Sequence, residues 1–461
     1  MNKHRLAIAI AICLCAPTWA LAQDQSEIDE LRQQIEELED RLDKQEAKDA
    51  AAAPEAVAIP DPVAPVPTGN AFNPAISLTI NAKYTDVKED PDTYYIGGFV
   101  PSGGGHGDDG GHSHGGGVER GFSLDESELT ISANIDPYWL GYFTAAVSDS
   151  EIGVEEAWIQ NGGTIPGVVA KAGRFLSGIG YINQQHPHAW DFADAPWVQQ
   201  VFFGGNLADD GVQLRYIAPT PLFLEFGLEA GRGANFPGSE TNDNGANAGA
   251  VFANLGGDFG FSNSYLIGAS YRQTQADERE YDDFDSASNE IENIFTDLES
   301  KIWGASLVWK WAPDGDPSIR NFKFQTEYFW REEDGQLGYD YDDGTGTFAQ
   351  EGPYSSTQSG WYAQAVWQFM PRWRVGARYD QLDSGDLEYQ PISNGSITRE
   401  DLQLLQENEP KRYTAMVDFS TSEFARFRLQ YEYDEARYDV TDQLIIFQYV
   451  VSLGAHGAHK F

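Results

Sequence analysis

The chain has 461 residues, and its 72 acidic against 30 basic side chains give it a formal net charge of −42 at pH 7. Charge of this sign and size repels the phosphates of nucleic acid, which excludes nucleic acid as a partner, and it attracts cations. Aromatic residues make up 13% of the chain and glycine is abundant. In an exported chain this composition is typical of a membrane β-barrel, whose apolar residues are spread over alternate positions.

Residues 1–22 have the pattern of a secretory signal peptide. A basic start is followed by a short apolar core, Leu6 to Cys15, and by an A-x-A cleavage site at residues 20–22. The core is too short to span a bilayer. Both cysteines of the chain lie in this segment, so the exported chain has no thiol for a disulfide, a thiolate metal site or cysteine catalysis.

Residues 23–48 carry a heptad pattern, which predicts an α-helical coiled coil in the periplasm. Three turns of helix are marginal alone, so self-association would supply the missing burial, and a single solvated helix is the alternative. Residues 49–73 are rich in alanine and proline, and we expect them to form an extended spacer. The apolar heptad positions are Ile28, Leu31, Ile35, Leu38 and Leu42.

From residue 74 the hydrophobic period changes to two. Ile76, Leu78 and Ile80 alternate with Ser77 and Thr79, and the same pattern recurs to the C-terminus. In a soluble sandwich both faces would seldom be so long and regular. The pattern predicts an all-β fold over residues 74–461, a transmembrane antiparallel β-barrel of about 16 strands with an apolar outer face and a polar lumen.

The connections between the predicted strands alternate between short turns and long segments, as in outer-membrane barrels with short periplasmic turns and long outer loops. One long segment contains a predicted short helix, Thr398 to Asn408, with a capping arrangement of Thr398 and Asp401. The chain ends at Phe461, which resembles the signal that the barrel-assembly machinery recognises in outer-membrane proteins. The long segments are Val87–Arg120, Leu176–Asp210, Gly231–Ala248, Gln275–Ser300, Glu332–Thr357 and Gln381–Pro410.

The long segment 176–210 follows the fifth predicted strand, Val169–Phe175, and it is irregular but rich in aromatic residues. No globular plug precedes the predicted barrel, so we expect this segment to fold inward and narrow the pore; packing on a neighbouring subunit is the alternative. Its charged groups would face basic residues of the polar strand faces, either creating a polar path across the pore or tying the segment to the wall. The predicted constriction residues are His186, His188, Trp190, Asp191 and Asp194 of the segment and Arg215, Arg374, Arg378, Arg426 and Arg428 of the wall.

Several stretches resemble the phosphate-selective porin family. They are KAGRF at 171–175, the inserted stretch that follows, DDGVQLRYIAPTPLFLEFGLEAGRG at 209–233 and the terminal phenylalanine. NAFNPAISL at 70–78, the His-rich first loop and HPHAWDFADAP at 186–196 resemble a group of which some members are labelled zinc-regulated outer-membrane receptors. The resemblance implies a sixteen-stranded, homotrimeric channel with substrate preference. The ladder of basic side chains that phosphate channels use is not evident, so phosphate selectivity is not expected.

Residues 103–117 form a second chemical signal, because three histidines and two aspartates stand among glycines. Imidazole and carboxylate groups suit Zn²⁺ and other divalent cations, so this segment is predicted to capture metal at the pore mouth. A surface loop with incidental histidines is the alternative, and no resident cofactor is required. The predicted ligands are His106, Asp108, Asp109, His112 and His114.

These patterns favour a passive outer-membrane channel of a Gram-negative bacterium for small hydrophilic solutes, with a preference for cations. An outer-membrane metal-uptake receptor with a closed barrel is the second possibility, and a coiled-coil envelope tether or surface-structural protein is the third. The expected partners are outer-membrane lipid, lipopolysaccharide, the barrel-assembly machinery and two further copies of the chain, held through barrel and coiled coil. No nucleophile motif such as G-x-S-x-G is present, so catalysis is not expected.

Overall fold

The computed structural model describes residues 74–102, 119–148, 151–163, 165–240, 244–342 and 344–454. The predicted signal peptide, coiled coil and spacer lie outside these residues. So do the His-rich segment 103–117 and Phe461. All of these stay predictions.

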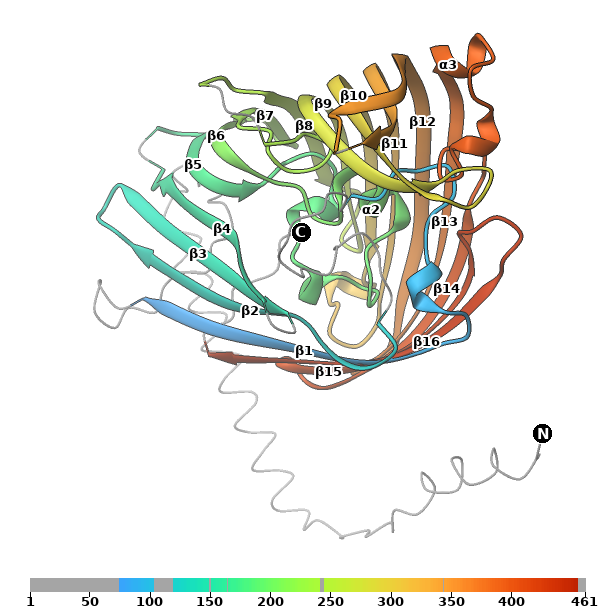
Figure 1. Ribbon diagram of the computed structural model, residues 1–461. Coiled ribbons are helices and arrows are strands. Elements are labelled where there is room, and N and C mark those ends of the chain that lie inside the picture. Colours follow the sequence, from blue (N-terminus) through green and yellow to red (C-terminus); the bar gives the residue numbers. More distant parts are fainter. Residues whose placement is uncertain are drawn as a thin grey trace, which may run out of the picture. The chain divides into compact units, whose positions relative to one another are not determined.

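The described residues form sixteen antiparallel strands that close into a barrel (Figure 1). Each strand pairs with the next along the chain, and β1 pairs with β16. The predicted architecture and strand number are confirmed. The strands are β1 Ala75–Val87, β2 Gly121–Asn134, β3 Trp139–Ser148, β4 Glu151–Asn161, β5 Val168–Leu176, β6 Ala208–Ile217, β7 Phe223–Gly231, β8 Ala248–Asp258, β9 Asn263–Phe284, β10 Glu290–Trp311, β11 Asn321–Asp342, β12 Thr347–Met370, β13 Trp373–Tyr389, β14 Lys411–Ser422, β15 Ala425–Glu435 and β16 Asp442–Gly454.

Side chains alternate between the outer surface and the lumen along each strand. On β15 and β16 the outward Leu429 and Phe447 are 48% and 46% exposed, whereas the inward Arg428 and Gln448 are 1% exposed. Apolar groups therefore face outward and polar groups inward, the reverse of a soluble β-protein. This is the pattern of a barrel whose outer surface meets lipid.

Strands β9 to β13 are much longer than the 9–11 residues that cross a bilayer, with 17 to 24 residues each. Two predicted long loops are therefore wrong, because most of 275–300 and 332–357 continues as paired strand, and the predicted loop Gln381–Pro410 begins only after Tyr389. The dense charges of these stretches conceal the alternation of their buried residues. The buried residues of these strand extensions pack with the connection after β13 and form an apolar cluster, here called the second apolar cluster because a larger one lies around α2 (Trp197–Phe203). It includes Val100, Tyr281, Phe295, Leu337, Tyr354, Tyr389, Leu402 and Leu405.

Within the residues that the structure describes, helical structure is confined to short pieces of the connections. The predicted helix 398–408 is wrong: only Arg399–Asp401 forms a 3₁₀ turn (η5), although the capping box of Thr398 and Asp401 is present. Leu402 and Leu405 are buried in the second apolar cluster instead. No helix among the described residues is long and apolar enough to cross a membrane. The other helical pieces are η1 Pro91–Thr93, η2 Ile182–Gln184, η3 Pro187–Ala189, α2 Trp197–Phe203, η4 Pro313–Gly315 and α3 Gln390–Ser393.

Candidate channel constriction

Residues 177–207, here called the inserted segment, connect β5 to β6 through the interior of the barrel (Figure 1). They contact side chains of β13 and β14, which lie eight strands away from β5 and β6 around the ring. Phe192 and Trp197 of the segment are at most 1% exposed. The segment therefore reaches across the lumen from one wall to the opposite one.

An apolar core holds the second half of the inserted segment. Trp197, Val201 and Phe202 of α2 are buried against Phe329 of β11 and Tyr362 of β12. The helix ends at Gly204, which adopts a left-handed conformation and donates its N–H to carbonyls of the last turn. Aromatic burial of this extent fixes the helix inside the lumen.

Two aspartates of the inserted segment are paired with basic residues of the wall. Asp191 lies 3.0 Å from Lys323 Nζ and 2.9 Å from Arg374 Nη1. Asp194 lies 2.7 Å from Arg378 Nη2 and 2.8 Å from Arg412 Nη1.

Burial opposes ionisation of both carboxyls, but the neighbouring cations outweigh it. They hold the pKa of Asp191 and of Asp194 well below the usual range. Both aspartates therefore stay charged and tie the segment to the wall.

The remaining predicted arginines differ in their partners. Arg426 and Arg428 donate to backbone carbonyls of the inserted segment, at 3.0 Å from His188 O and 3.1 Å from Trp190 O. Arg215, in contrast, forms an ion pair with Glu225 of the neighbouring strand β7. The structure thus brings Arg374, Arg378, Arg426 and Arg428 to the segment, while Arg215 serves pairing within the wall.

The two histidines lie on the other side of the lumen, against carboxylates of β2 and β4. His188 Nδ1 is 2.6 Å from Glu128, and the two ring nitrogens of His186 are 3.0 Å from Glu155 and 2.9 Å from Glu156. Burial disfavours a charged His186, but these carboxylates outweigh burial and raise its pKa well above the ordinary value. We call Glu126, Glu128, Glu155, Glu156, His186 and His188 the acidic cluster.

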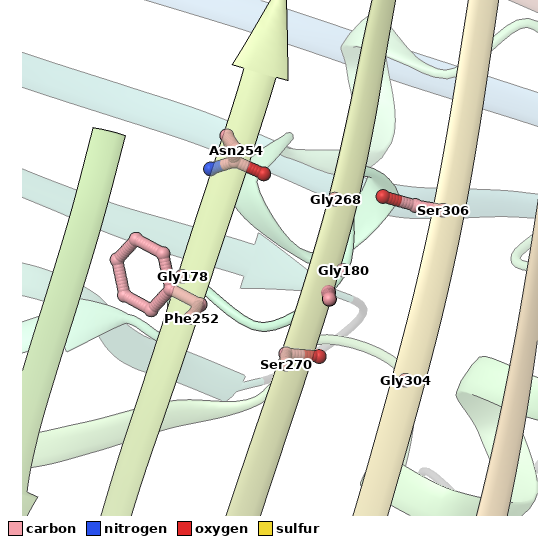
Figure 2. A pocket seen from close by; sticks show the side chains of 9 residues that line it. Gly178, Gly180, Phe252, Asn254, Gly268, Ser270, Gly304 and Ser306 are labelled. Atoms are coloured by element: carbon pink, nitrogen blue, oxygen red, sulfur yellow. The ribbon is translucent and has the colours of Figure 1, made fainter. Parts of the chain in front are cut away.

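Carboxylates also hold the start of the inserted segment. Glu229 accepts hydrogen bonds from Gly178 N (2.7 Å) and Ser177 Oγ (2.6 Å), and Glu327 accepts one from Tyr181 N (2.6 Å). Figure 2 shows Gly178 and Gly180 close to Phe252 and to the small residues of β9 and β10, with a narrow crevice between them. A Cβ on Gly178 would lie 2.3 Å from the Phe252 ring, so the segment approaches the wall more closely than a side chain allows.

A cavity of about 460 Å³ lies between the inserted segment and the short turns of the barrel. His188, Arg374 and Arg426 line it on the segment side, and Ser318 and Phe424 line it at the turns. Polar and charged groups of the segment and its wall therefore face a space that is large enough for water.

Sequence reasoning missed several partners of the segment, namely Lys323, Asp380, Arg412, Glu327, Glu229 and the four glutamates of the acidic cluster. Lys323 and Glu327 stand on the polar face of a predicted strand, so their inward orientation could have been found. Their contact with Asp191 and Tyr181 could not, because it depends on where the segment crosses the lumen.

No family model matches the chain. Among solved structures, the in-vitro folded trimer form of OmpT, an outer membrane protein of Vibrio cholerae, is 8% identical, with a TM-score of 0.48 over 83% of this chain and 100% of that one. Pseudomonas putida OprB is 13% identical, with a TM-score of 0.48 over 83% and 94% of the two chains. For the outer membrane channel DcaP of Acinetobacter baumannii the identity is 11% and the TM-score 0.43, over 83% and 97%.

A protein of Aquifex aeolicus (strain VF5), described as uncharacterized, is 31% identical over 415 residues, which cover 85% of this chain and 80% of that protein. At this identity, over most of both sequences, the chain belongs to the same family as the Aquifex aeolicus protein.

Proposed function

We propose that this protein is an outer-membrane channel of a Gram-negative bacterium for passive diffusion of small hydrophilic solutes, and that the inserted segment forms its constriction. The observation that carries the proposal is the pairing of Asp191 and Asp194 with four basic side chains of the wall. Together with the apolar outer face of the strands, these pairs describe a lipid-embedded barrel narrowed from within.

A preference for cations is part of this proposal. Two of the basic groups near the inserted segment are each paired with two acids: Arg374 pairs with Asp191 and Asp418, and Arg412 pairs with Asp194 and Glu432. The four glutamates of the acidic cluster face two histidines, His186 and His188, and the side chain of Glu155 is 20% exposed. Local negative charge at a constriction favours cations.

Planar-bilayer recording of the purified full-length protein tests both statements. We expect ohmic single-channel steps and, under a KCl gradient, a reversal potential displaced toward that of K⁺. D191N/D194N should give larger and noisier steps, because the segment loses its ties to the wall. Unchanged steps in this variant would contradict the assignment of the constriction, and a reversal potential on the Cl⁻ side would contradict the cation preference.

A closed-barrel metal-uptake receptor is the second candidate, and one observation favours it. Trp197, Phe202 and Phe203 are at most 2% exposed and pack with lumen-facing Phe329 and Tyr362, so part of the lumen is a dry core. The same recording distinguishes the two, because a receptor closed at rest would show no ohmic steps.

The remaining expectations lie outside the described residues and stay part of the proposal. They are metal capture by His106, Asp108, Asp109, His112 and His114, a periplasmic coiled coil that supports a homotrimer, and recognition of Phe461 by the assembly machinery. Outer-membrane lipid and lipopolysaccharide would surround the barrel, and a tether role through residues 23–73 is the third candidate. Deleting 103–117 and titrating Zn²⁺ tests the capture, and unchanged binding would discard it.

A further inference from the structure

Two β-bulges bring the carboxylates of the acidic cluster together. On β2, Glu128 pairs with Thr79 and Asp125 pairs with Asn81, so β2 has one residue more than β1 in this interval. On β4, Glu156 pairs with Thr144 and Val154 pairs with Ala145, which leaves Glu155 without a partner on β3. A bulge redirects the side chain of the extra residue. Consecutive residues Glu155 and Glu156 therefore both reach His186 of the inserted segment.

His186 completes a compact set of metal-binding atoms. One ligand atom each from Glu126, Glu128, Glu155 and His186 lies within 4.8 Å of the other three. Nδ1 of His186 is 3.0 Å from Glu155 Oε2 and 3.3 Å from Glu128 Oε2. One N–H on this nitrogen can point at only one of the two oxygens.

The other ring nitrogen of His186 is held by a fixed acceptor. Nε2 is 2.9 Å from Glu156 Oε2, and the second oxygen of Glu156 accepts from Trp158 Nε1 (3.0 Å) and Leu176 N (3.2 Å). Donation of Nε2–H to Glu156 would leave the Nδ1 lone pair directed at the other carboxylates. A carboxylate behind a histidine is the usual arrangement around a metal-binding imidazole.

One observation independent of the acidity of the cluster points to a cation at this position. Glu128 is 2% exposed, and its Oε2 accepts no hydrogen bond from the described residues. This oxygen lies inside the cluster, 3.3 Å from Nδ1 of His186. A divalent cation among these oxygens would satisfy the buried acceptor.

We propose that Glu126, Glu128, Glu155 and His186 bind one divalent transition-metal cation inside the barrel, with Glu156 as a positioning residue. Carboxylates with one imidazole and no thiolate suit Zn²⁺, Mn²⁺, Fe²⁺ or Co²⁺, whereas Ca²⁺ takes oxygen ligands alone. His188 holds the second oxygen of Glu128 at 2.6 Å. None of these residues belongs to segment 103–117, and metal binding at the acidic cluster does not require the channel to conduct.

Zn²⁺ calorimetry of the full-length protein in detergent tests the proposal. The background variant is H106A/H112A/H114A/H456A/H459A, which removes every imidazole of the exported chain except those of His186 and His188. We expect one Zn²⁺ per chain, with Ca²⁺ unable to displace it. E128Q, E155Q and H186A should each weaken binding at least about 10-fold, the lower bound seen even for residues behind the ligands.

E225Q is the matched control, because it removes a buried carboxylate of the wall that pairs with Arg215 and does not belong to the acidic cluster. It should bind Zn²⁺ as the background does. Folding of every variant is checked by its circular dichroism and by its heat-dependent gel mobility. In addition, bound Co²⁺ should give a visible absorption band that H186A shifts.

Three results would overturn the proposal: no Zn²⁺ binding by the folded background, undiminished binding by folded E128Q and E155Q, or an equal loss in E225Q. Channel conductance is recorded on the same preparations. Failure of metal binding therefore stays distinguishable from failure of the proposed channel function.

Discussion

The substitution D194N should release the middle of the inserted segment without unfolding the barrel. Asp194 is paired with Arg378 and Arg412, whose side chains are 0% and 4% exposed. Removing one partner of a buried ion pair leaves an uncompensated charge and costs about 3 kcal/mol or more. At 1.4 kcal/mol per factor of ten, this shifts the equilibrium between the docked and released segment by on the order of 100-fold. The strand ladders do not depend on Asp194, so the loss should be local.

Hydrogen exchange measured by mass spectrometry reads this equilibrium directly. The amide of Ala193 donates to Gln430 and the amide of Trp197 donates to Asp380, at 2.9 and 3.0 Å. Both amides should exchange on the order of 100-fold faster in D194N, because they are protected only while the segment is docked.

The matched control is D210N, which removes a carboxylate from the ion pair between Asp210 and Arg174. This pair lies at the surface, where the side chains of Arg174 and Asp210 are 38% and 42% exposed. Such a pair contributes at most about 1 kcal/mol, so exchange should change less than roughly 5-fold. Equal exchange rates in D194N and the unmodified protein would refute the reasoning that this pair holds the segment.

Further outcomes are expected for the wall, the pH response and the lipid face. G178A should weaken docking of the inserted segment on the wall by about 1–3 kcal/mol, because the new Cβ would overlap Phe252. The control G153A should have no such effect, since there is open space around its Cβ. Equal hydrogen exchange of the Ala193 amide in the two variants would argue against close docking. The lowered pKa values of Asp191 and Asp194 mean that their pairs contribute stability above the ordinary value of about 4 and lose it only as the pH falls through the lower folded values. Conductance should therefore show no transition from these groups between pH 7 and about 4, and a step near the ordinary aspartate pKa would contradict the pairing. F447R places a charge on the outer face of the barrel, and it should destabilise the protein in vesicles by about 1–4 kcal/mol, as measured by urea titration. The control F261R, at a short turn, should not destabilise it. Equal effects of the two substitutions would argue against a lipid-facing Phe447.

The sequence predicted those features of the fold that depend on residues close together in the chain, namely the number of strands and the face on which each side chain lies. Alternation such as that of Leu429 and Tyr431 with Arg428 and Gln430 is local, so strand number and face could be found from period two. The outer parts of β9 to β13 were predicted as loops because charged residues fill one face there. In the structure these parts are strands, because each one pairs with the adjacent strand.

The site depended on contacts that no local pattern contains. Asp191 and Asp194 were expected to meet basic residues, but the choice of Lys323 and Arg412 requires the path of the inserted segment. Prediction of the acidic cluster would have required still more information, because the bulges on β2 and β4 must both lie next to His186 of the inserted segment. A register shift of one residue reverses the direction of a side chain, and sequence periodicity does not locate such shifts.

The connection of the inserted segment between β5 and β6 also constrains the order in which the protein assembles. The segment belongs to the first half of the chain, yet its partners Arg374, Arg378 and Gln430 follow it by 183 to 237 residues. Contacts between such distant residues form late. Asp191 and Asp194 must therefore stay hydrated while most of the strands are made. Because β16 closes the ring onto β1, strands β13 and β14 lie opposite β5 and β6 only in the closed barrel, so docking of the segment is coupled to closure of the ring.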